Sequence, residues 1–256
     1  MKKPIVVIGI GELAGVFTQG FLRSGYPVYP ITRGMDLEVE CSQIPDPELV
    51  FIMVQESELH KLLAKIPEGW RSKLGLLQNE LLPRDWQSHK IIKPTVTVVW
   101  FEKKKQQLLS NILYSPSFGP KAEIISQALQ AVDIPAPILD NEEQLLYELL
   151  RKALYILTVN IAGLVDNCTV GDLWNKNQSL AKEIAGEVIL VQEKMTGKQL
   201  PHEKLINGMV DGIKDCPDRH CLGRSAMSRL KRILAYAQEA NIKIPKLLEI
   251  YTRATA

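Results

Sequence analysis

Residues 4–15 read Pro-Ile-Val-Val-Ile-Gly-Ile-Gly-Glu-Leu-Ala-Gly, and this stretch decides the fold of the first half of the chain. The apolar run over residues 5–8 is typical of a strand that is buried on both faces. Two glycines end the run, and apolar residues then recur at helical spacing over residues 14–22. The order of strand, glycine-rich turn and helix predicts the first part of a βαβ unit.

The small residues of this turn have separate roles in holding a diphosphate. Gly9 allows the tight turn, Gly11 lets the main chain approach the phosphates, and Ala14 lets the helix pack closely on the strand. The free amides and the partial positive charge at the helix N-terminus then face the diphosphate. A lone G-x-G-x-x-A is a weak signal, but here it lies between a predicted strand and a predicted helix. We therefore predict a dinucleotide-binding unit, with Glu12 and Leu13 also at the cofactor.

The end of the second predicted strand, residues 26–31, favours NADP over NAD. NAD-binding units usually carry an acidic residue about 20 residues beyond the glycines, where it accepts hydrogen bonds from the ribose. Here the strand leads into Thr32 and Arg33. A guanidinium can bind a 2′-phosphate with paired donors, and the Thr32 hydroxyl can assist. In the alternative interpretation, Arg33 is an ordinary surface arginine and Asp36 binds the ribose. The sequence favours the first interpretation and therefore NADP(H).

Neither the composition nor the charge indicates a nucleic-acid or membrane partner. Apolar residues make up 46% and charged residues 23% of the 256 residues, as in ordinary globular proteins. The net charge of +2 is too small for a nucleic-acid-binding surface. No segment approaches the ~18 continuous apolar residues of a membrane span. Gly9 and Gly11 interrupt the N-terminal apolar run before a signal-peptide core could form, so we expect a cytoplasmic protein.

The four cysteines indicate neither a disulfide framework nor a metal site. Cys216 and Cys221 lie near His220, so a metal site has to be considered. Their CxxxxC spacing has no second pair, whereas zinc sites usually show tighter CxxC or HxxxH pairs. We therefore expect a cysteine-containing loop at this place and no metal.

The chain changes its pattern near residue 120. Before it, short apolar runs separated by helix-length segments predict a parallel sheet with crossover helices; the runs are 5–8, 26–31, 49–54, 74–77 and 96–101. After it, apolar residues at helical spacing predict helices over 142–166, 173–196, 202–213, 222–241 and 244–253. Residues 115–120, Ser-Pro-Ser-Phe-Gly-Pro, are typical of a hinge. The predicted fold class is α/β, with an N-terminal Rossmann-type dinucleotide-binding domain (residues 1–120) followed by an all-helical C-terminal domain (residues 121–256).

The first long helix of the second half carries Lys152 and Asn160, two helical turns apart. A lysine in such an apolar helix is costly unless a partner satisfies it. The alternative is a lysine that reaches solvent from the helix edge, and the spacing alone favours this interpretation of Lys152.

These segments together resemble the ketopantoate reductase (2-dehydropantoate 2-reductase) family, within the 6-phosphogluconate dehydrogenase-like superfamily. The glycine turn, Arg33 and the pair Gln78-Asn79 carry the resemblance in the first half. In the second half, Lys152, Asn160 and the Gly171-Asp-Leu segment fall in the family's register. The resemblance covers the whole chain and identifies it as a divergent member.

The resemblance implies a reductase that uses NADPH on a small 2-oxo acid. Lys152 would be the general acid that protonates the developing alkoxide, and its charge would polarise the ketone. Asn79 would lie near both the nicotinamide and the substrate, and Asn160 would bind the substrate. Val54 and Gln55, which follow the third strand, would line the cofactor. The long apolar helix around residues 181–191 either packs against a second subunit, as in related proteins, or completes a single core, so the sequence leaves a homodimer and a monomer open.

The substrate pocket departs from the family's pattern. Counting back from Pro245, the family's glutamate falls at Ser225, and an asparagine one helical turn after the lysine is Ile156. Each lost hydrogen bond leaves a polar group unpaired at a cost of about 1–3 kcal/mol. Two functions are therefore expected: an NADPH-dependent reductase of a small 2-oxo acid or related carbonyl or imine with an altered pocket, or a catalytically degenerate NADP-binding protein that acts as a sensor or interaction partner.

Overall fold

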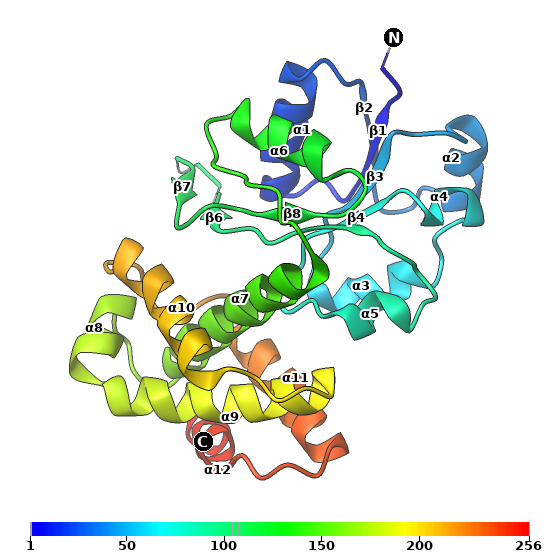
Figure 1. The fold of residues 1–256 in the computed structure, drawn as a ribbon. Helices are drawn as coiled ribbons and strands as arrows, with labels where there is room; N and C mark the ends of the chain where they lie inside the picture. Colours follow the sequence, from blue (N-terminus) through cyan, green and yellow to red (C-terminus); the bar gives the residue numbers. More distant parts are fainter. Residues whose placement is uncertain (1, 104, 107, 256) are drawn as a thin grey trace. The chain divides into compact units, whose positions relative to one another are not determined.

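The computed structural model describes residues 2–103, 105–106 and 108–255 and divides the chain into two compact units, residues 1–149 and residues 150–256 (Figure 1). The first unit contains the sheets, and the second consists of helices and loops. This confirms the α/β fold class, with a Rossmann-type sheet followed by a helical part. Among the helices described, none is long and apolar enough to cross a membrane.

The main sheet of the first unit has six strands in the order β2-β1-β3-β4-β5-β8. Neighbouring strands are parallel except for β8, which runs antiparallel to β5. The order reverses direction between β1 and β3, and such a switch point is where open α/β sheets bind ligands. The strands are β1 (Ile5–Ile8), β2 (Val28–Ile31), β3 (Leu49–Ile52), β4 (Leu74–Leu76), β5 (Thr95–Thr97) and β8 (Ser117–Phe118).

The remaining strands and helices of this unit are short. Strands β6 (Phe101–Glu102) and β7 (Ser110–Asn111) form a separate antiparallel pair. The helices are α1 (Glu12–Arg23), α2 (Leu37–Gln43), α3 (Glu56–Leu63), α4 (Glu68–Arg71), α5 (Pro83–Gln87) and α6 (Ala122–Gln130). The apolar run predicted as one strand over 96–101 is therefore divided between β5 and β6.

Helices α1 and α6 pack together on one face of the sheet (Figure 1). Alternate strand residues point to this face, and Phe17 of α1 makes an edge-on contact with Phe51 of β3 at 4.9 Å between ring centroids. Ile125 and Leu129 of α6 are fully buried in the same cluster. This packing fixes the position of α1, and therefore of the turn that precedes it.

The division of the chain lies inside α7 (Glu142–Ala162), whereas the sequence places the domain boundary after residue 120. Helix α6 accounts for the difference, because its apolar face completes the core of the first unit. The Pro- and Gly-rich segment 115–120, predicted as a hinge, contains β8 of the sheet.

The second unit is built from the C-terminal part of α7 and five further helices. These are α8 (Val170–Lys176), α9 (Gln178–Thr196), α10 (His202–Asp215), α11 (Ala226–Glu239) and α12 (Pro245–Thr255). The helix predicted over 173–196 is interrupted at Asn177, whose φ of −124° and ψ of 39° end α8 before α9 begins. Residues 152–155 of α7 are buried on all sides, as expected for a helix that is apolar around its circumference.

Candidate functional site

The predicted cofactor residues of the first unit all follow the carboxyl ends of adjacent parallel strands. Ile8 of β1 pairs with Ile31 of β2 and with Ile52 of β3. The loops after these strands therefore begin side by side, and the loop after β4 lies next to them. The structure brings together at this edge the residues Gly9, Gly11, Glu12, Leu13, Ala14, Thr32, Arg33, Val54, Gln55 and Asn79.

The turn between β1 and α1 has the geometry that the small residues predict. Gly9 has a φ of +97°, and a Cβ there would lie 2.8 Å from the carbonyl oxygen of Met53. Gly11 is the N-cap of α1, and no side chain caps the helix. A Cβ on Gly11 would meet nothing within 4 Å, so the space beside Gly11 is open. Ala14 is buried where α1 packs on the sheet.

The loop after β2 separates the roles of Arg33 and Asp36. Asp36 is the N-cap of α2, and its Oδ1 accepts hydrogen bonds from the amides of Glu38 and Val39 at 2.9 and 3.3 Å. Arg33 is exposed and makes no hydrogen bond or ion pair with any residue that the structure describes. Thr32 is also exposed and begins a turn that the amide of Met35 closes on the Thr32 carbonyl at 3.3 Å.

The loops after β3 and β4 are held together by Gln78, whose side chain is buried. Its amide nitrogen donates to the carbonyls of Ile52 and Val54 at 3.2 and 3.3 Å. The amide of Asn79 donates to Oε1 of Glu56, in the first turn of α3, at 3.0 Å. Asn79 and Val54 are half-buried and Gln55 is exposed. Gln78 and Glu56 therefore fix the position of Asn79 at this edge.

Lys152 lies on α7 in the second unit and is only 5% exposed. Its Nζ lies 5.8 Å from the centroid of the Tyr155 ring, one helical turn further on. Burial raises the pKa of Tyr155, and the guanidinium of Arg219 opposes part of this rise. Lys152 is thus not a lysine that extends from the helix edge into solvent, which the spacing alone favoured.

Asn160, two turns further along α7, is held by two partners within the second unit. Its Nδ2 donates to the carbonyl of Cys221 at 3.0 Å, and its Oδ1 accepts from Arg229 of α11 at 2.9 Å. These contacts fix the orientation of the amide, because a carbonyl only accepts and a guanidinium only donates. Nδ2 carries a second N–H, so the amide still has a donor beyond its contact with Cys221.

Ser225 is the N-cap of α11 and is half-buried, and its side chain makes no capping hydrogen bond. Arg229 lies one turn further along the same helix and is buried. The sequence analysis did not identify Arg229, because an arginine at helical spacing is typical of a solvated helix face. Only its contact with Asn160 indicates a different role.

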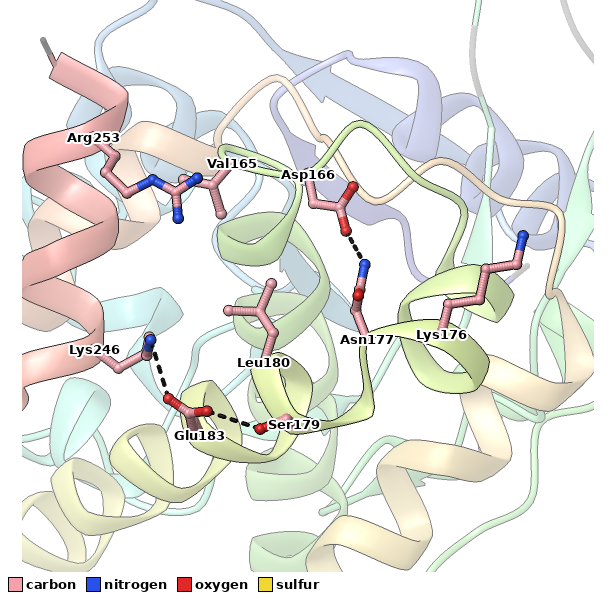
Figure 2. Close-up of a pocket in the computed structure, with 9 residues that line it drawn as sticks. All are labelled: Val165, Asp166, Lys176, Asn177, Ser179, Leu180, Glu183, Lys246 and Arg253. Carbon is pink, nitrogen blue, oxygen red and sulfur yellow. Dashed lines mark hydrogen bonds and ion pairs between the residues drawn. The ribbon is translucent and has the colours of Figure 1, made fainter.

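Lys152, Asn160 and Ser225 are not among the residues that line the cavity of the second unit shown in Figure 2. It has a volume of about 440 Å³ and is lined by residues from the loop after α7 and from α8, α9 and α12. Two of its lysines form ion pairs, Lys246 with Glu183 at 3.1 Å and Lys176 with Asp172 at 2.8 Å. No group of three or more potential metal ligands occurs among the described residues.

No protein-family model and no curated protein matches the sequence, whereas solved structures match its fold over nearly the whole chain. A ketopantoate reductase from Ralstonia eutropha is 14% identical with a TM-score of 0.69, and 98% of this chain and 97% of that chain are covered. A dimeric ketopantoate reductase from Staphylococcus aureus is 16% identical with a TM-score of 0.66, at 97% and 98% coverage. D-mandelate dehydrogenase in complex with NADH is 16% identical with a TM-score of 0.67, at 99% and 97% coverage.

These likenesses agree with the resemblance that the sequence motifs indicate. Sequence identity to the three proteins is 14–16%, so the likeness is one of backbone arrangement. The parallel sheet with its glycine turn and the helical second unit both fall within the aligned region. The chain therefore has the fold of the ketopantoate reductases.

Proposed function

We propose that this protein is an NADPH-dependent reductase of a small 2-oxo acid or a related carbonyl or imine. One observation carries the proposal: an uncapped helix N-terminus, an exposed arginine and two further loops all lie at the carboxyl edge of four adjacent parallel strands. This edge contains the switch point of the sheet. The fold that the chain shares with ketopantoate reductases supports the same class of reaction.

The residues at this edge fit an NADP-type dinucleotide. The open space beside Gly11 would admit the diphosphate to the first-turn amides of α1. Arg33 is free to bind a 2′-phosphate, whereas Asp36 is engaged as the cap of α2. This difference favours NADP over NAD, because the acidic side chain is turned to the α2 amides. When bound, the nicotinamide would supply the hydride.

Lys152 is proposed as the general acid. Its ammonium group lies on a buried helix, and a low-dielectric setting strengthens its interaction with a developing negative charge. It would donate a proton from Nζ to the substrate oxygen as the hydride arrives. Asn160, oriented by Arg229 and Cys221, would use its second N–H to hold the substrate. Asn79, anchored by Glu56, would contact the nicotinamide and the substrate.

The cofactor assignment is tested by calorimetric titration of the full chain with NADPH and with NADH. We expect tighter binding of NADPH, and Arg33→Ala should weaken it by about tenfold or more, because a charge-assisted hydrogen bond contributes roughly 1.5–3 kcal/mol. Asp36→Ala is the matched control from the same loop and should leave the preference unchanged. Equal affinity for the two nucleotides, or a preference lost in Asp36→Ala rather than Arg33→Ala, would contradict the assignment.

The catalytic assignment is tested by following NADPH oxidation with a panel of 2-oxo acids. Lys152→Ala should lower kcat by at least about 10²-fold, which is the usual contribution of a general acid, and should leave NADPH affinity almost unchanged. Lys176→Ala removes an exposed, ion-paired lysine of the same unit and should retain wild-type kcat. Full turnover in Lys152→Ala would exclude Lys152 as the acid.

Ser225 favours a second candidate function, a catalytically degenerate NADP-binding protein that acts as a sensor or interaction partner. A serine stands at the start of α11 where the family resemblance places a glutamate. The titration and the turnover assay separate the two candidates. NADPH binding without oxidation of NADPH on any member of the panel would select the sensor.

A homodimer is proposed as the assembly, on the precedent of the dimeric ketopantoate reductase from Staphylococcus aureus. Light scattering on the purified full chain tests it, and a mass of one chain would exclude it.

A further inference from the structure

Two cysteines from distant parts of the second unit lie side by side. The Sγ atoms of Cys168 and Cys221 are 3.7 Å apart. The amide of Cys221 donates to the carbonyl of Cys168 at 3.1 Å, and the next residues, Thr169 and His220, form an antiparallel bridge. Cys168 and Cys221 are therefore directly opposite each other on two antiparallel segments, before α8 and before α11.

The two thiols differ in their access to solvent. Cys221 is fully buried, whereas Cys168 is partly exposed. Burial raises the pKa of both thiols, and the carboxylates of Asp166 and Asp172 raise it further. A reagent from solution therefore reaches Cys168 first, and Cys221 is accessible mainly to the sulfur of Cys168.

We propose that Cys168 and Cys221 are a modification site, at which a low-molecular-weight disulfide such as oxidised glutathione forms a reversible intramolecular disulfide. The raised pKa leaves only a small fraction of Cys168 as thiolate at neutral pH, and this thiolate attacks one sulfur of the small disulfide, so that a mixed disulfide forms and one small thiolate leaves. The thiolate of Cys221 then attacks Sγ of Cys168 and displaces the second small thiolate. The protein loses two electrons and two protons, and the small disulfide becomes two thiols.

The local geometry needs only a small adjustment for this bond. A disulfide requires Sγ atoms about 2.05 Å apart and Cβ atoms about 3.5–4.5 Å apart. Residues directly opposite on antiparallel segments have Cβ atoms about 4.5–5.5 Å apart, so side-chain rotation and a slight approach of the segments are sufficient. The hydrogen bond from the amide of Cys221 to the carbonyl of Cys168 already holds the two segments in this register.

The disulfide would also fix a contact of Asn160, the proposed substrate-binding side chain. The carbonyl of Cys221 accepts a hydrogen bond from Asn160. Linking Cys221 to Cys168 ties this carbonyl to the segment that follows α7, although formation of the disulfide itself does not depend on the proposed function.

The test is a cysteine map of the full chain after incubation with oxidised glutathione. Free thiols are alkylated in acid-quenched samples, and the protein is digested without reduction and analysed by mass spectrometry. We expect a peptide in which Cys168 is linked to Cys221, with Cys41 and Cys216 alkylated, and loss of the link after treatment with dithiothreitol. A lasting glutathione adduct on Cys168 without the link, or a link made mainly through Cys216, would overturn the proposal.

Single variants identify the order of attack. In Cys221→Ser, Cys168 should retain a glutathione adduct, because the resolving thiol is absent. In Cys168→Ser, Cys221 should remain alkylatable only after unfolding. Cys41→Ser is the control from the first unit and should form the link at the wild-type rate. If a variant at 168 or 221 fails to fold by circular dichroism, the wild-type map alone decides the question.

Discussion

The backbone at Gly9 adopts a φ of +97°, a conformation in which a side chain is strained, and it lies against the carbonyl of Met53. Gly9→Ala should therefore lower the free energy of unfolding by about 1–3 kcal/mol, since it adds both strain and a close contact. Urea denaturation measures the change.

Gly15→Ala is the matched control, one turn into α1. A Cβ at Gly15 meets nothing within 4 Å, and the exchange in a helix interior should stabilise the protein by roughly 0.5–1 kcal/mol. If Gly9→Ala were as stable as Gly15→Ala, the turn would not have the tight geometry described.

Single residues differ in how far the sequence predicts their role. The roles of Gly9 and Ala14 are predicted because only small residues fit at these two places. Asp36 could not be assigned from sequence, since an aspartate before a helix can either cap the helix or bind a ribose. The hydrogen bonds to the α2 amides identify it as a cap. Gln78 is recognised in the sequence only as part of a motif, and its bonds to the neighbouring loop come from the structure.

At the scale of elements, the start of α12 depends on a carboxylate from α9. The two oxygens of Glu187 accept hydrogen bonds from the amides of Lys246 and Leu247, both at 2.8 Å. Glu187→Ala should lower the free energy of unfolding by about 1–2 kcal/mol, because it removes the cap of a helix N-terminus. Chemical denaturation measures the loss.

Glu183→Ala provides the comparison on the same helix. Glu183 forms a surface ion pair with Lys246 and accepts a hydrogen bond from the Ser179 hydroxyl one turn earlier, so its removal should cost about 1 kcal/mol or less. A cost for Glu187→Ala no greater than that for Glu183→Ala would show that the cap does not stabilise α12.

The sequence predicts the existence of elements better than their ends and partners. The parallel strands and the long helices of the second half follow from apolar periodicity, because burial requires it. The apolar periodicity does not predict the break at Asn177, because the apolar spacing continues across it. The pattern also does not predict which element α6 packs against. An amphipathic helix shows that one of its faces is buried, but not against which element.

At the scale of the whole molecule, the proposed cofactor residues belong to the first unit. Hydrogen–deuterium exchange with and without NADPH should therefore show gained protection in the loops after β1, β2, β3 and β4. Helix α12 of the second unit serves as the internal reference and should gain no comparable protection. Protection confined to α12, with none at the carboxyl edge of the sheet, would contradict the proposed binding edge.

The candidate residues of the two units differ in how well the sequence predicts their neighbours. In the first unit, the topology of a parallel sheet places every strand's carboxyl end at one edge, so residues far apart in the chain are predictably neighbours. In the second unit, no such rule connects α7 with the start of α11. The contact of Arg229 with Asn160 depends on helix packing that one sequence does not reveal.

The two outer strands of the main sheet have a further consequence for how this chain avoids aggregation. β2 lies at one edge and contains Pro30, which has no N–H to offer an incoming strand. At the opposite edge, Ser117 of β8 exchanges backbone hydrogen bonds with Pro137 and Leu139, so a segment of the same chain occupies the exposed ladder. Each edge of the main sheet therefore offers fewer free backbone groups on which another molecule could extend the sheet.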